Sequence, residues 1–234
     1  MLDLRSDLDS LWRAAARLTP GKGGRAIMFM SIHEEAGTSS IAASFALKTA
    51  SRSQKTTWLV DIDFANNSLI DAFETGFAQG VGRPGRPYDA SLGQIPFFDV
   101  SVPGREQSKA SLQSGKLLAA HQINGTRLLV TRFRNERLAY GQKVRLSTRS
   151  AWWKAARKSA DWIIVDAPAF LASKASLNLV KNMDGVVLVV SGDKAEALSV
   201  MTLKREIEAA GGHVLGVVMN QMRADALLAD RLAG

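Results

Sequence analysis

Residues 26–49, AIMFMSIHEEAGTSSIAASFALKT, constrain this chain more than any other stretch. An apolar run typical of a buried strand ends in a polar loop, which leads through Gly37-Thr38-Ser39-Ser40 into a stretch with helical spacing. This is the layout of a phosphate-binding loop, in which backbone N–H groups at a helix N-terminus face an anion. The position that carries lysine in such loops holds Thr38. A glycine followed by hydroxyl residues also satisfies a plain strand-to-helix turn, and that alternative stays open.

Strand and helix patterns alternate along most of the chain. We expect strands at Ala26–Met30, Thr57–Asp61, Thr126–Thr131, Asp161–Ala167, Gly185–Val190 and His213–Met219, and helices at 3–18, Ser39–Ala50, Thr148–Ser159, 173–182 and Lys194–Ala210. Strands separated by helices form parallel pairs, so the pattern predicts one α/β domain with a doubly wound, mainly parallel sheet over residues 1–234. Within it, residues 1–24 are expected to form a helix and linker, and residues 76–116 an irregular, loop-rich segment.

The charge of the chain is concentrated in its middle. Residues 78–160 contain 15 Lys and Arg against 4 Asp and Glu, a net charge of +11, whereas the whole chain has a net charge of +8. Such a segment attracts an acidic protein, an anionic membrane surface or nucleic acid, although a solvated surface is the plain alternative. The sequence has no cysteine, no signal-peptide pattern and no apolar run of about 20 residues that could cross a bilayer.

Polar residues follow four of the expected strands. They are the loop 31–40, Asp61 with Asp63, Asp166, and Asn220. Because ligands of open parallel sheets bind beyond the carboxyl ends of the strands, these groups are expected to converge on one site. A single acid at a strand end often caps a turn, and Asp61 or Asp63 could do only that.

The phrases that surround these residues resemble a known family. SSIAASFALKTA, WLVDID, DWIIVDAP, MDGVVLVVSGDKAEALSV and GHVLGVVMNQ are similar to the corresponding segments of the MinD/ParA-type P-loop ATPases, and within that group to the bacterial tyrosine autokinases and regulators of exopolysaccharide synthesis. The resemblance covers roughly residues 25–75 and 160–222. It implies the P-loop ATPase topology.

The resemblance also implies residue roles. Asp61, Asp63 and Asp166 match catalytic acids, which with Ser39 would hold Mg²⁺ through hard oxygen ligands. Gly37, Thr38, Ser39 and Ser40 match the phosphate-binding positions, and Asn220 matches a residue that hydrogen-bonds adenine. ATP and Mg²⁺ are therefore the implied cofactors.

The chain departs from the family pattern at the loop itself. Where the motif reads G-x-G-K-[ST], this sequence has Glu35-Ala36-Gly37-Thr38-Ser39, so that Glu35 replaces the first glycine and Thr38 the lysine. The resemblance to autokinases also lacks their tyrosine-rich tail, since the only tyrosines are Tyr88 and Tyr140. We therefore expect that ATP hydrolysis has been lost, that nucleotide binding is weak at best, and that the three acids are vestigial.

These departures predict a pseudoenzyme, a regulatory or scaffold subunit of exopolysaccharide synthesis or export. The implied partner is the cytoplasmic segment of a membrane polysaccharide co-polymerase or export protein, with homo-oligomers as a further possibility. The implied location is the cytoplasm, with the inner-membrane surface as a peripheral site. Two alternatives stay open: an active Mg-ATPase or kinase with an atypical loop, and a ParA-like positioning protein that binds DNA nonspecifically through its basic surface.

Overall fold

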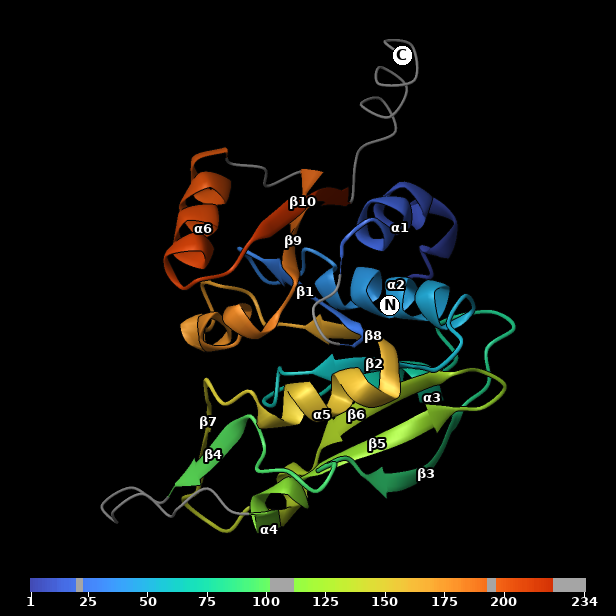
Figure 1. Cartoon of the computed structure of the whole chain (residues 1–234), viewed down its shortest axis with the longest axis vertical. Helices are drawn as coiled ribbons and strands as arrows, with labels where there is room; N and C mark the ends of the chain where they lie inside the picture. The colour runs from blue at the N-terminus through green and yellow to red at the C-terminus, as the bar shows by residue number, and fades with distance from the viewer. Residues whose placement is uncertain (20–22, 102–111, 193–196, 221–234) are drawn as a thin grey trace.

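A computed structural model of the protein describes residues 1–19, 23–101, 112–192 and 197–220. An eight-stranded sheet runs through its middle (Figure 1). In spatial order its strands are β10 (Val214–Asn220), β9 (Gly185–Ser191), β1 (Arg25–Ser31), β8 (Ala160–Asp166), β2 (Thr56–Asp61), β6 (Leu128–Phe133), β5 (Leu118–Ile123) and β3 (Pro84–Asp89). The first six run parallel to one another, β5 pairs antiparallel with β6, and β3 pairs antiparallel with β5, so the doubly wound, mainly parallel sheet is confirmed.

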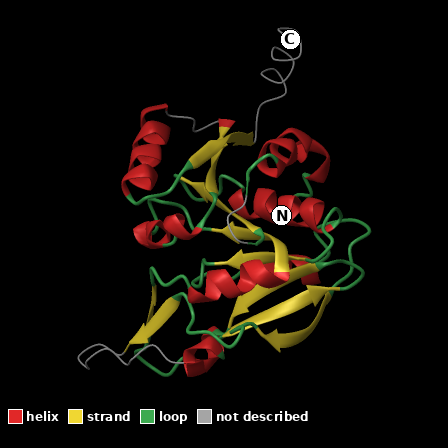
Figure 2. Cartoon of the chain, viewed as in Figure 1, coloured by secondary structure: helices red, strands yellow, loops and turns green. Residues whose placement is uncertain are grey.

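Helices cover both faces of the sheet (Figure 2). One face carries η1 (Arg5–Leu8), α1 (Asp9–Ala16), α2 (Thr38–Ala50) and α3 (Leu69–Glu74). The other carries α5 (Ala151–Ser159), α6 (Ala197–Ala209) and the 3-10 turns η3 (Lys174–Asn178) and η4 (Val180–Asn182). The short α4 (Leu112–Gly115) and η2 (Asn135–Arg137) lie in the connections. In the described part of the chain, no helix is both long and apolar enough to span a bilayer.

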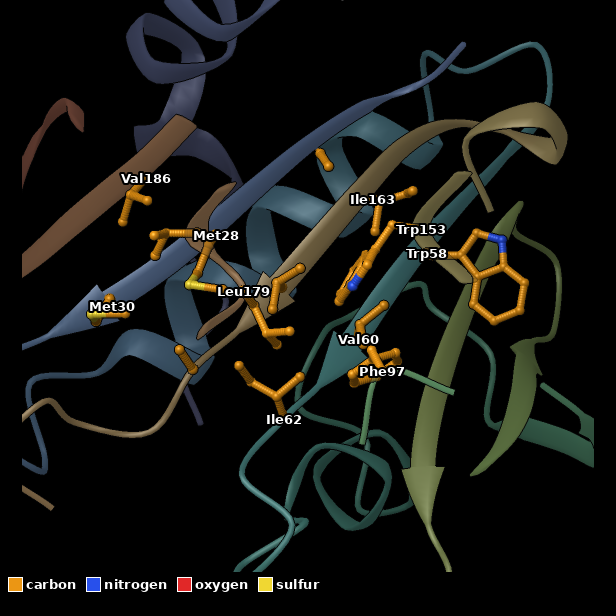
Figure 3. Close-up of a cluster of buried hydrophobic side chains, with 14 of the residues drawn as sticks. Met28, Met30, Trp58, Val60, Ile62, Phe97, Trp153, Ile163, Leu179 and Val186 are labelled. Atoms are coloured by element: carbon orange, nitrogen blue, oxygen red, sulfur yellow. The ribbon is translucent and has the colours of Figure 1, made fainter. Parts of the chain in front are cut away.

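Two apolar cores result, one on each face of the sheet. Figure 3 shows the core on the α5 side, where Met28, Trp58 and Ile163 of the sheet meet Trp153 and Leu179. Trp152 and Trp153 are adjacent on α5, and both are buried. The indole of Trp152 packs on Trp58 and donates a hydrogen bond of 2.7 Å to the carbonyl oxygen of Ala90. Neither ring is available for an interface.

The segment 76–116 is more regular than its composition predicts. It supplies β3 and β4 (Phe98–Ser101), and β4 pairs with β7 (Lys143–Leu146) in a separate two-stranded ribbon. Pro84 and Pro87 are tolerated in β3 because it is the last strand of the sheet, and edge strands accept residues without an N–H donor. The loop-rich segment therefore contains two short strands, while residues 102–111 lie outside the described residues.

Several expected elements differ in type or bounds. The helix expected at 3–18 is divided into η1 and α1, and the helix expected at Thr148–Ser159 begins at Ala151. The segment 173–182 forms η3 and η4 instead of one α-helix, consistent with the low helix propensity of Asn178 and Asn182. The strand expected at Thr126–Thr131 begins at Leu128, because Thr126 closes a turn: its hydroxyl donates to the carbonyl of Ile123 at 2.8 Å and accepts the N–H of Leu128 at 3.0 Å. The start of the helix expected at Lys194–Ala210 and the end of the chain lie outside the described residues.

Candidate functional site

The loop between β1 and α2 keeps the backbone of a phosphate-binding loop without its usual residues. Gly37 has φ +82°, in the left-handed region that glycine adopts without strain. Glu35 has φ +63°, also left-handed, although a side chain there costs roughly 1–2 kcal/mol. The position where the resemblance expects glycine therefore still has a glycine conformation, while a glutamate occupies it.

Gly37 and Asn220 lie in contact at the end of the sheet. The Nδ2 of Asn220 donates a hydrogen bond of 2.9 Å to the carbonyl oxygen of Ala36. A Cβ atom on Gly37 would lie 2.2 Å from the same Nδ2, so no larger residue fits there without movement. Asn220 therefore lies at the loop, as its place at a strand end predicts, but its amide binds the loop backbone.

Asp61 and Asp166 end the neighbouring strands β2 and β8 in direct register, and both are buried. Burial, followed by the negative charge of Asp166, raises the pKa of Asp61 well above its usual range. Its carboxylate accepts the backbone N–H of Asp63 at 2.9 Å and a further hydrogen bond from that of Leu69. Asp61 thus fixes the turn that follows β2, which is the role of a capping residue.

Asp166 is the carboxylate of this group that reaches the loop. It accepts a hydrogen bond from Ser39, and its Oδ1 is buried with no hydrogen-bond partner in the described part of the chain. The pKa of Asp166 is raised to about 7, chiefly by burial; the hydrogen bond from Ser39 lowers this pKa, and the negative charge of Asp63 raises it. A buried carboxyl with one unpaired oxygen is costly, so this atom fits a donor or cation better than an apolar neighbour.

Asp63, Thr38 and Ser40 lie close to the loop, and each is placed by its local surroundings. The carboxylate of Asp63 accepts hydrogen bonds from the backbone N–H of Asn66 at 3.3 Å and from its side-chain Nδ2 at 2.7 Å. Ser40 accepts the N–H of Leu2 at 3.3 Å, and Thr38 is buried at the first turn of α2. Among the described residues, no three His, Asp or Glu side chains are grouped so that they could hold a metal ion.

A cavity of about 880 Å³ opens above these residues. Its lining includes Glu34, Glu35 and Asp63, hydroxyls from α2, and apolar side chains that include Val144 and Leu146 of β7. The described residues that line it include no Lys or Arg. Sequence reasoning missed β7, although the alternation in Lys143-Val144-Arg145-Leu146 is a strand signal.

The residues of this site match the implied cofactors, Mg²⁺ and ATP, only in part. Ser39 and Asp166 are placed to share a Mg²⁺ ion, which prefers oxygen ligands. For the triphosphate, the described lining offers no cation in place of the missing lysine, and two glutamates border the loop.

Comparisons with known proteins agree with the fold. No model of a known protein family matches the chain. It is 26% identical over 203 residues to the tyrosine-protein kinase CpsD of Streptococcus agalactiae, covering 86% of this chain and 77% of the relative. The VpsO kinase domain superposes with a TM-score of 0.59 at 15% identity, covering 94% of this chain and 95% of that one.

A second solved structure extends the likeness beyond kinases. The MinC:MinD cell division complex of Aquifex aeolicus matches with a TM-score of 0.53 at 17% identity, covering 88% of this chain and 72% of the other. The parallel sheet, the loop between β1 and α2 and the carboxylates at the ends of β2 and β8 agree with this grouping. The chain therefore has the fold of the MinD/ParA-type P-loop proteins and is similar in sequence to a bacterial tyrosine kinase.

Proposed function

We propose that this protein is a catalytically degenerate member of its superfamily and acts as a regulatory or scaffold subunit in exopolysaccharide synthesis or export. The observation that carries the proposal is the loop: Glu35 holds the left-handed conformation of a glycine, and Thr38 stands where the lysine would reach the phosphates. Similarity to a tyrosine kinase supports the role in exopolysaccharide synthesis or export. The altered loop supports the loss of ATP hydrolysis.

The magnitudes favour very weak nucleotide binding. A charge-assisted hydrogen bond to phosphate contributes about 1.5–3 kcal/mol. The hydrogen bond that the lysine would donate is missing, because Thr38 stands at its position. Each exposed glutamate beside the phosphates opposes binding by about 1 kcal/mol or more. In a relative whose dissociation constant for ATP is near micromolar, these changes would therefore raise that constant to roughly millimolar.

Titration with a fluorescent ATP analogue, with and without Mg²⁺, tests this proposal. We expect a dissociation constant near or above ~1 mM in both conditions. Tight, Mg²⁺-dependent binding would instead support the alternative of an active Mg-ATPase or kinase with an atypical loop. That alternative is favoured by one observation, the contact between Ser39 and Asp166, which keeps two Mg²⁺ ligands together.

The partner is proposed from charge and kinship. A cytoplasmic segment of a membrane polysaccharide co-polymerase would meet the basic segment 78–160, placing the protein in the cytoplasm at the inner-membrane surface. Exposed members of that segment include Arg86, Arg137 and Lys143. Binding should weaken as salt rises, because exposed charges are screened beyond about 8 Å at physiological ionic strength.

A gel shift with nonspecific duplex DNA over several salt concentrations tests the ParA-like alternative.

A further inference from the structure

A second cavity opens at the opposite end of the sheet from the loop between β1 and α2. It has a volume of about 470 Å³ and lies where the neighbouring strands β1, β8 and β2 begin. Three segments that are far apart in the chain, 23–25, 52–55 and 160–162, form its lining. Since these strands are six or seven residues long, about 20 Å separates this cavity from the loop at their other ends.

The lining of this cavity carries an excess of positive charge. Arg25, Arg52 and Lys55 supply three cations, and among the described residues that line it Asp161 supplies one carboxylate, which leaves a net charge of +2. That carboxylate is already engaged, because its Oδ2 accepts the backbone N–H groups of Gln54 at 2.7 Å and of Lys55 at 2.8 Å. The cavity therefore favours an anion, in contrast to the larger cavity with its acidic rim.

The cations of the lining retain N–H groups for a ligand. A guanidinium has five N–H donors and an ammonium three. Arg25 donates from Nε to the carbonyl of Leu18 at 3.0 Å and from Nη2 to that of Ala16 at 3.1 Å, and among the described residues its Nη1 has no acceptor. Lys55 donates to one group, the carbonyl of Lys158, at the long distance of 3.4 Å. An anion in the cavity would be met by donors that the fold does not consume.

Aromatic rings hold both arginines in place. The guanidinium carbon of Arg25 lies 5.1 Å from the ring centroid of Trp162, and that of Arg52 lies 4.6 Å from that of Trp12. A stacked guanidinium loses less conformational freedom on binding an anion than a free side chain does. The Nη2 of Arg52 is also 3.4 Å from the exposed carboxylate of Asp9, and such exposed ion pairs are weak enough for a ligand to compete.

The end of α2 borders the cavity, and free carbonyl groups at a helix C-terminus repel an anion. Two of these carbonyls are capped by hydroxyl groups. The hydroxyl of Ser51 donates to the carbonyl of Lys48 at 2.8 Å, and that of Ser53 donates to the carbonyl of Thr49 at 2.8 Å. This capping reduces the repulsion, so the side-chain cations determine the sign of the charge that the cavity prefers.

We propose that this cavity binds a phosphate-class oxyanion, either inorganic phosphate or a phosphomonoester, between Arg25, Arg52 and Lys55. A phosphate dianion matches the net charge of the lining, and the forked guanidinium groups match its oxygens in pairs. The volume lies within the range of small-molecule sites and leaves room for the group that carries the phosphate of a monoester. This inference does not rest on the proposed role in polysaccharide synthesis.

An NMR titration of inorganic phosphate into the isotope-labelled full chain tests the site. We expect the backbone amides of residues 53–55 to shift and saturate with a dissociation constant of about 0.1–1 mM at low salt. Chloride at the same ionic strength should cause no saturating shift. The amides of Gly37 and Ser39 monitor the N-terminus of α2, which could also attract phosphate. Shifts that are confined to those two amides, or that never saturate at residues 53–55, would overturn the proposal.

Variants of opposite sign test the assignment of the residues. Arg52→Gln with Lys55→Gln should weaken phosphate binding at least ~10-fold, because two of the three cations are lost. Asp161→Asn should strengthen it at least ~3-fold, because the amide oxygen still accepts the N–H groups of the turn but carries no charge. The amide spectrum of each variant without phosphate verifies that it is folded. Unchanged affinity in the first variant, or weaker binding in the second, would contradict the site.

A matched control separates the site from the net charge of the protein. Arg86 and Lys154 are exposed and do not line this cavity. Arg86→Gln with Lys154→Gln removes the same two kinds of cation and should leave phosphate binding within ~2-fold of wild type. If both double variants lose affinity equally, only the overall charge attracts phosphate, and the proposal fails.

Two further probes identify the source of the phosphate group. Glycerol 3-phosphate represents soluble phosphomonoesters, and phosphatidylcholine vesicles that contain phosphatidic acid present the same group at a membrane surface. Binding of glycerol 3-phosphate supports a soluble ligand. Binding of the vesicles alone, lost in Arg52→Gln with Lys55→Gln, supports a lipid headgroup in the same cavity. If inorganic phosphate, glycerol 3-phosphate and the vesicles all fail to bind, the proposal is overturned.

Discussion

Asn220, at the end of β10, contacts Gly37 in the loop between β1 and α2 through its side-chain amide. The Nδ2 of Asn220 donates to the carbonyl of Ala36 at 2.9 Å, and the space that a side chain at Gly37 would need is the space that this amide occupies. The loop and the end of β10 are therefore packed as one unit, which explains why glycine is required at this position even without a bound phosphate.

Gly37→Ala should destabilise the fold by about 2–4 kcal/mol, from left-handed strain and from the clash with Asn220. Gly76→Ala separates the two causes, since Gly76 has φ +78° but nothing within 4 Å of an added Cβ, and it should lose only about 1–2 kcal/mol. Adding Asn220→Ala to Gly37→Ala should recover part of the loss. Urea unfolding measures all three, and equal losses at Gly37 and Gly76 would refute the contact.

Glu35→Gly should stabilise the protein by about 0.5–1 kcal/mol, because glycine adopts a φ of +63° without strain. Glu34→Gly is the matched control: it removes the same charge from the neighbouring position, which does not have a positive φ, and should destabilise by about 0.5–1 kcal/mol. Thermal unfolding of both variants at one pH checks the difference in sign. If both changes shift stability in the same direction, charge and not backbone strain dominates the loop.

Asp166→Asn should change how stability depends on pH. Because burial raises the pKa of Asp166 to about 7, the native state holds a proton that the unfolded state releases near pH 4, so stability falls as pH rises between about 4 and 7. The amide carries no charge, and the variant should gain roughly 1–3 kcal/mol over wild type at pH 8 but little at pH 4. Asp71→Asn, at an exposed position of α3, is the control. Urea unfolding at both pH values measures the gain, and an equal effect of Asp166→Asn at pH 4 and pH 8 would contradict the shift.

The core of the fold could be predicted because its strands are apolar runs of the right length. Ala26–Met30, Asp161–Ala167 and Gly185–Val190 each lie within one residue of the observed strand bounds. Strands that depend on a neighbour were missed. The sequence Leu118–Ile123 has little strand propensity, and it forms β5 because it pairs with β6, which no local pattern reveals.

The candidate site was predictable in place but not in detail. Strand ends bring Asp166, Ser39 and the Gly37–Asn220 pair together, as their order along the chain implies. What the sequence could not show is how each oxygen is used. Asp61 and Asp63 accept hydrogen bonds from their own turns, and only three-dimensional contacts separate such capping from metal binding. The assigned roles in catalysis and nucleotide binding are still predictions.

The most direct measurement is calorimetric titration of Mg-ATP into wild type and into Glu35→Gly with Thr38→Lys. The account predicts no resolvable binding below ~1 mM for wild type and at least ~10-fold tighter binding for the double variant, because the glycine relieves the loop and the lysine supplies the missing cation. Glu35→Gly with Thr38→Met, which has a long side chain without the charge, should bind as weakly as wild type. Micromolar, Mg²⁺-dependent binding by wild type would contradict the claim that this loop has lost its nucleotide.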